Sequence, residues 1–188
     1  MTVAIVGAGR PLLAELGPGG SGAFDLVVHL LGPEDRPPHG LAGLVDFVSG
    51  GAITDVLRDR RLFAGRDGEA VMLVRRGPGL GAATLLAGLG DGAWDDGAET
   101  KLRLDRWVER IAALGRTRVI VGVPAGPHRA GVRLAIASAL ARAVSEHAAE
   151  GGSGVAWTLA VEADDVARLR HELDGPLRAA SPDDVPTS

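Results

Sequence analysis

Residues 24–31 read FDLVVHLL, an almost continuous apolar run, and residues 117–123 read TRVIVGV in the same manner. A strand without alternating polar residues is typical of a parallel sheet that helices cover on both faces. We therefore predict that Phe24–Leu31 and Arg118–Val123 are central strands of a three-layer α/β/α domain.

Further strands and helices follow from the rest of the pattern. Residues 69–76 and 82–90 read as two strands joined by a Gly-Pro-Gly turn, which predicts a hairpin and hence a mixed sheet. Residues 51–62 and 98–115 have the spacing of amphipathic helices, and residues 155–163 and 164–173 that of a last strand and a last helix. The resulting order is strand, strand, helix, strand, strand, helix, strand, helix, strand, helix.

The helix predicted for residues 129–150 is apolar around most of its circumference. An outer helix of a three-layer domain is covered on one side, so Val132, Ile136 and Leu140 would form an exposed second flank. We expect this flank to be an interface in a homo-oligomer or a larger assembly. The alternative is that the last helix covers it within the monomer.

The N-terminal residues TVAIVGAG raise the question of a dinucleotide-binding turn. The G-x-G-x-x-G fingerprint would need a third glycine where Leu12 stands, and the following helix could have only about two turns. An edge strand followed by a flexible loop is the favoured interpretation.

Composition limits the class of protein. The chain has 188 residues, 46% of them hydrophobic, which is enough for one hydrophobic core. We therefore predict that residues 1–178 form a single domain and that residues 179–188 form a disordered tail. There are no cysteines, the net charge is -4, and no apolar run reaches about 18 residues. The N-terminal residues do not have the pattern of a secretory leader, so we expect no export. We expect a cytoplasmic protein that binds no membrane, and nucleic-acid binding is disfavoured.

One long segment resembles a known family. Residues 49–91 read SGGAITDVLRDRRLFAGRDGEAVMLVRRGPGLGAATLLAGLGD and are similar to the N-terminal domain of leucine aminopeptidases, which is macro-domain-like. That family has a glycine-led short helix, an F-x-G-x-x-G-E turn and a strand ending in VGLG. The counterparts here are Gly50-Gly51, then Phe63, Gly65, Gly68 and Glu69, then Leu89-Gly90, with Ala87 in place of valine. The similarity extends over about residues 2–161.

The resemblance implies an accessory domain without the peptidase. The family's catalytic domain binds two metal ions and uses two lysines, whereas Lys101 is the only lysine here and nothing matches the NTDAEGRL signature. The five histidines show no metal-ligand spacing and no serine lies in G-x-S-x-G. We therefore expect no catalytic residue, no metal and no cofactor.

Three functions stay open. The first is a non-catalytic interaction, regulatory or assembly module that associates with itself or with a full-length aminopeptidase. The second, implied by the macro-like fold, is binding of a nucleotide or ADP-ribose-type molecule, and the third is DNA binding. For the second, the candidate ligand loops comprise Gly88, Gly90, Asp91, Pro124, Gly126 and His128. Acidic residues near Asp91 would oppose a dianionic ligand, so weak or no ADP-ribose binding is expected.

Overall fold

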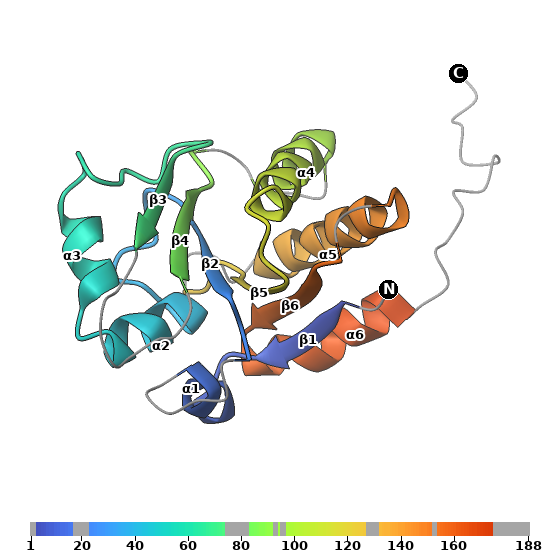
Figure 1. Ribbon diagram of the computed structural model, residues 1–188, viewed down its shortest axis with the longest axis horizontal. Helices are drawn as coiled ribbons and strands as arrows, with labels where there is room; N and C mark the ends of the chain where they lie inside the picture. The colour runs from blue at the N-terminus through green and yellow to red at the C-terminus, as the bar shows by residue number, and fades with distance from the viewer. Residues whose placement is uncertain are drawn as a thin grey trace, which may run out of the picture.

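A six-stranded sheet lies between two layers of helices (Figure 1). This computed structural model describes residues 3–16, 23–73, 83–91, 94, 97–126, 132–151 and 154–174. The elements are β1 (Ala4–Gly7), α1 (Arg10–Leu16), β2 (Leu26–Leu31), α2 (Gly40–Val48), α3 (Ala52–Arg58), β3 (Ala70–Leu73), β4 (Ala83–Gly88), α4 (Ala98–Ala112), β5 (Arg118–Gly122), α5 (Arg133–Ala149), β6 (Ala156–Val161), a 3-10 turn (Ala163–Asp165) and α6 (Val166–Asp174).

The strand order is β1-β6-β5-β2-β4-β3. All neighbouring strands are parallel except β3, which runs antiparallel to β4. The predicted mixed sheet is therefore confirmed. The two apolar runs become β2 and β5, which pair with each other in the middle of the sheet, as predicted.

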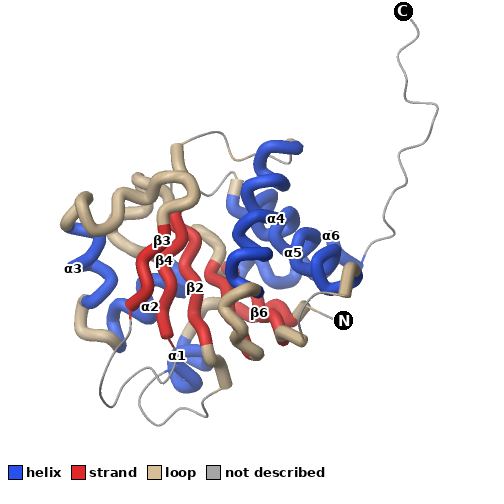
Figure 2. Tube along the Cα trace, turned by 45° about the horizontal axis from the view of Figure 1, so that its top comes forward, coloured by secondary structure: helices blue, strands red, loops and turns tan. Residues whose placement is uncertain are grey.

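Alternate residues of β2 enter different cores, which explains why its sequence does not alternate. Leu26, Val28 and Leu30 belong to the core under α4, α5 and α6, and Val27 and Leu31 to the core under α1, α2 and α3. Figure 2 shows α4, α5 and α6 grouped on one side of the sheet. The three-layer α/β/α class is confirmed.

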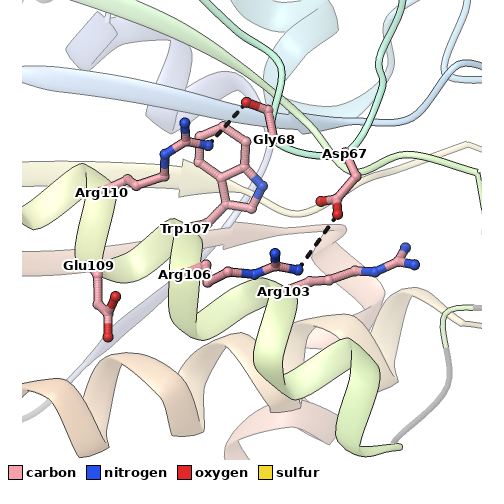
Figure 3. A pocket seen from close by; sticks show the side chains of 7 residues that line it. All are labelled: Asp67, Gly68, Arg103, Arg106, Trp107, Glu109 and Arg110. Carbon is pink, nitrogen blue, oxygen red and sulfur yellow. Dashed lines mark hydrogen bonds and ion pairs between the residues drawn. The ribbon is translucent and has the colours of Figure 1, made fainter.

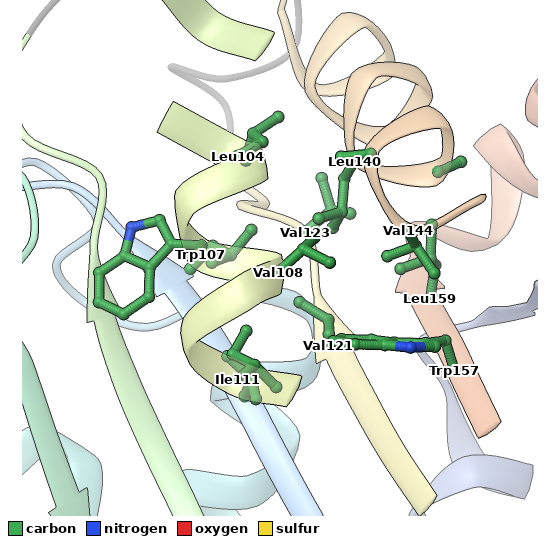
Figure 4. Close-up of a cluster of buried hydrophobic side chains, with 14 of the residues drawn as sticks. Leu104, Trp107, Val108, Ile111, Val121, Val123, Leu140, Val144, Trp157 and Leu159 are labelled. Atoms are coloured by element: carbon green, nitrogen blue, oxygen red, sulfur yellow. The ribbon is translucent and has the colours of Figure 1, made fainter. Parts of the chain in front are cut away.

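The larger core is formed by α4, α5 and the strands beneath them (Figure 4). Trp107 and Val108 of α4, Leu140 of α5 and Trp157 of β6 are all at most 3% exposed. Each such large side chain contributes about 1.5–3 kcal/mol relative to an exposed position. This core fixes α4 against the sheet.

The exposed flank predicted on α5 is wrong. Ile136 and Leu140 are fully buried, and Val132 packs against the same core. The reason is that α5 contacts α4, α6 and β6 at once, so its broad apolar surface is covered within the monomer. The predicted homo-oligomer stays a prediction, without support from these three residues.

Two short helices were missed by the sequence pattern. The segment after β1, predicted to be a flexible loop, contains α1, whose Leu12 and Leu16 are buried. Residues 40–48 form α2, which buries Leu41, Ala42 and Val45. The edge position of β1 agrees with the prediction, and the predicted tail of residues 179–188 lies outside the described residues.

Candidate functional site

The carboxyl ends of the parallel strands bring the predicted ligand loops to one edge of the sheet. Gly88 ends β4, with Gly90 and Asp91 directly after it, and Pro124 and Gly126 follow β5. Because β2 pairs with both β4 and β5, the end of β2 lies between the two loops. His128 lies outside the described residues.

A turn of the chain's own backbone covers the first of these loops. A Cβ atom added to Gly88 would lie 2.0 Å from the carbonyl oxygen of Arg66, and one added to Gly90 would lie 2.9 Å from Asp67. The amide of Gly90 donates to the carbonyl of Gly65 over 2.8 Å, and that of Gly88 to Glu69 over 2.7 Å. These glycines therefore allow close packing of residues 65–69, and Asp91 is exposed beside them.

The same turn contains the F-x-G-x-x-G-E residues, and each has a structural role. Phe63 is fully buried in the core beneath α2 and α3. Gly65 has φ +82°, and a Cβ there would lie 2.6 Å from the backbone of Gly32. The carboxylate of Glu69 accepts hydrogen bonds from the amides of Ala64 at 2.9 Å and Arg66 at 3.0 Å. The pattern thus encodes a turn that closes the end of β4.

An arginine fixes the neighbouring loop after β2. The guanidinium of Arg36 donates to the carbonyl oxygens of Pro33, Leu57 and Phe63, and so ties this loop to the end of α3. Burial lowers the pKa of Arg36. The amide of Gly32 donates to the buried carboxylate of Asp35 over 2.6 Å.

The second predicted loop packs closely against its surroundings as well. A Cβ on Gly40, at the start of α2, would lie 2.7 Å from the Cβ of Ala125. Pro124 lines a cavity of only about 10 Å³ beside Arg133 and Asp165, which form an ion pair. The hydrogen bond to Asp165 raises the pKa of Arg133. A water molecule, but no larger ligand, fits this cavity.

A larger cleft, of about 310 Å³, lies between α4 and residues 67–68 (Figure 3). The lining side chains are mostly charged and come chiefly from α4: Asp67, Gly68, Arg103, Arg106, Trp107, Glu109 and Arg110. None of the candidate ligand residues predicted from the sequence belongs to this group. Its signal is three arginines at i, i+3 and i+7, which lie near one another on a helix surface.

Two of these arginines are held against indole rings. The guanidinium carbon of Arg110 lies 4.9 Å from the ring centre of Trp107, and that of Arg103 lies 5.4 Å from Trp94. Arg110 also donates to the carbonyl oxygen of Gly68 over 3.0 Å, while Trp107 donates from Nε1 to Gly88 over 3.2 Å. The cleft is therefore attached to the turn that covers the end of β4.

His29 is the buried titratable group of the central strand. Its side chain is 1% exposed, and neither ring nitrogen has a hydrogen-bond partner among the described residues. Burial lowers the pKa of His29 to about 3, which the carboxylate of Asp46 counteracts only in part. His29 is thus neutral near pH 7.

The described part of the chain also bears on metal binding and on membrane insertion. It holds no group of three or more His, Asp or Glu residues that could bind a metal ion. None of its helices is by itself long and apolar enough to cross a bilayer; α2 and α3 pass that test only when counted together across a 112° bend.

Comparison with known proteins assigns the fold class. No protein-family model matches the sequence, and no curated protein matches it. Among solved structures, a mutant of tomato leucine aminopeptidase superposes with a TM-score of 0.60 at 15% identity, over 91% of this chain and 36% of that one. The chain thus spans about a third of the length of that protein.

Macrodomains superpose equally well. A mutant macrodomain from Oceanobacillus iheyensis gives a TM-score of 0.59 at 12% identity, over 90% of this chain and 89% of that one. The Trypanosoma brucei macrodomain in complex with ADP-ribose gives 0.55 at 17% identity, over 81% and 64% of the two chains. The chain has an α/β macro-like fold.

Proposed function

We propose that this chain is a non-catalytic macro-fold module that associates with a protein partner, namely an aminopeptidase of the leucine aminopeptidase type. The turn of residues 63–69 carries this proposal. It has the residue pattern of the N-terminal domain of those enzymes, and its backbone packs on Gly88 and Gly90. The superposition on about a third of the tomato enzyme supports a domain of that kind.

The experiment is light scattering during size-exclusion chromatography. The purified chain is run alone, and then mixed with the leucine aminopeptidase of its source organism. We expect a mixed species whose mass exceeds that of the enzyme alone by one or more 19.2 kDa units. Separate elution of the two proteins at tens of micromolar would contradict association.

Binding of an ADP-ribose-type ligand is the second candidate function. The observation that favours it is the Trypanosoma brucei macrodomain, which was solved with ADP-ribose and shares this fold. Against it, residues 65–69 pack directly on Gly88 and Gly90, and Ala125 packs on Gly40, so these glycines face other parts of the chain and not open space. We therefore expect calorimetry with ADP-ribose to give at most millimolar affinity at this edge. A micromolar constant that is lost on Gly126→Leu substitution would favour the second candidate instead.

A further inference from the structure

We propose that the cleft between α4 and residues 67–68, here called the arginine cleft, binds a small ligand through its phosphoryl group. This site lies on the α4 side of the turn, away from the loop of residues 124–126. The proposal does not depend on association with an aminopeptidase.

The arginine cleft presents guanidinium groups that are already positioned. Arg103 is held by Trp94 and by an ion pair with Glu99, and Arg110 by Trp107 and the carbonyl oxygen of Gly68. Ordering a long side chain costs conformational entropy, and here the protein has largely met that cost before a ligand arrives. Stacking on an indole also leaves the N–H groups at the edge of the guanidinium able to donate in its plane.

Arg106, between these two, is the arginine most available to a ligand. Its side chain is 54% exposed and its ion-pair partner is Asp67 at 3.6 Å, which is beyond ideal hydrogen-bond length. Its Nε donates to the carbonyl oxygen of Leu102 over 3.4 Å, and this leaves the terminal nitrogens for a ligand. Figure 3 shows the carboxylate of Asp67 directed at Arg106, while Glu109 points away from this pair. Asp67 thus occupies the position that an anionic oxygen of the ligand would take.

The chemistry of the cleft favours phosphoryl groups over carboxylates. Positions i and i+7 of a helix are separated by about 10 Å along the axis, so the three arginines form an extended row. The three oxygens of a phosphoryl group can bond to two guanidiniums at once, whereas a carboxylate typically pairs with one fork. The volume of about 310 Å³ is at the lower end for small-molecule sites, so a phosphoryl group together with a further group of the ligand can enter.

Calorimetric titration with inorganic pyrophosphate at low ionic strength tests the site. Arg106→Gln should weaken binding by about tenfold or more, because it removes a charged hydrogen-bond donor from the ligand. The matched control is Arg142→Gln on α5, whose side chain is 53% exposed and also has one distant ion-pair partner, at 3.9 Å. It should change the affinity less than about twofold, since it makes the same change of charge outside the cleft.

A second pair of variants tests the role given to Asp67. Asp67→Asn should strengthen pyrophosphate binding by several-fold, because it removes the competing carboxylate. The control is Asp55→Asn, at an exposed aspartate that pairs with Arg58 at 3.5 Å. This variant should leave the affinity for pyrophosphate unchanged. Succinate should bind at least about tenfold more weakly than pyrophosphate.

Three results would overturn the proposal. They are no heat of binding at millimolar pyrophosphate, equal losses for the Arg106 and Arg142 variants, and equal affinity for succinate and pyrophosphate. Urea unfolding of each variant must match the unsubstituted protein, and these exposed positions are expected to meet that condition.

Discussion

At the scale of single residues, His29 has the environment that is hardest to judge from sequence: a neutral imidazole in an otherwise apolar strand. The spacing of the histidines by itself disfavours a metal site among them. The structure adds the physical consequence, which is that both ring nitrogens are buried without a hydrogen-bond partner among the described residues. As the pH is lowered, this imidazole therefore binds a proton at a higher pH in the unfolded chain than in the folded chain.

The first prediction follows from that difference. The pKa of His29 is about 3 in the folded protein against 6.5 for the free side chain, so the unfolded state binds more protons between these values. The folded protein therefore has its full stability with respect to this group above pH 6.5, where the imidazole is neutral in both states. Its free energy of unfolding falls as the pH decreases toward 3. Urea unfolding at pH 7 and pH 5 should show a loss in the free energy of unfolding of about 2 kcal/mol.

The substitution His29→Leu separates this residue from the other titrating groups. It replaces the imidazole by an apolar side chain of similar size and should remove most of the loss between pH 7 and pH 5. The same pH dependence in the substituted and unsubstituted proteins would contradict the assignment.

The second prediction concerns the glycine at the end of β4. Gly88→Ala should lower the free energy of unfolding by about 1–3 kcal/mol, because the new Cβ would lie 2.0 Å from the carbonyl oxygen of Arg66. Gly154→Ala is the control, since nothing lies within 4 Å of its Cβ position. Equal midpoints of urea unfolding for the two variants would show that the turn can move aside at little cost.

At the scale of elements, the burial of α5 changes what a substitution there is expected to do. Ile136 is fully buried between the sheet and the neighbouring helices, so its replacement affects folding rather than an interface. The third prediction is that Ile136→Ala lowers the free energy of unfolding by about 2–5 kcal/mol through the cavity it leaves. Leu102→Ala on α4, where the leucine is 58% exposed, should change it by less than about 0.5 kcal/mol. A comparable loss from both variants, measured in urea, would contradict the packing of α5.

How well the sequence predicts an element depends on the length of that element and on how much of its stability comes from packing against the sheet. The apolar runs at β2 and β5 and the periodic segments at α4 and α5 are long enough to be recognised, and the structure contains all four. The first missed helix, α1, has only seven residues, and α2 begins at Gly40 and contains Gly43. Both are held by packing against the sheet more than by intrinsic helix propensity, which sequence patterns cannot register.

The sequence says less about the candidate site than about the fold, for a similar reason. The sequence placed Gly88, Gly90, Pro124 and Gly126 at ends of strands, and parallel strands do bring those ends together. Whether a glycine makes space for a ligand or for another part of the chain depends on a contact distant in sequence, here between Gly88 and Arg66. The arginine cleft depends in the same way on Gly68 meeting Arg110, which is 42 residues further along the chain.

At the scale of the whole molecule, the macro-like fold is compatible with two kinds of function. Macrodomains and the tomato aminopeptidase superpose on this chain with similar TM-scores and low identity, so the fold alone cannot choose between them. The covered end of β4 argues against ADP-ribose binding at that loop. The fourth prediction therefore concerns mass in solution.

The most direct measurement is light scattering of the chain mixed with the leucine aminopeptidase of its source organism. We predict a complex that elutes as one species, heavier than the enzyme alone by a whole number of 19.2 kDa chains, and that persists when ADP-ribose is added. Two separate species, with the chain at 19.2 kDa throughout the micromolar range, would contradict the proposed association.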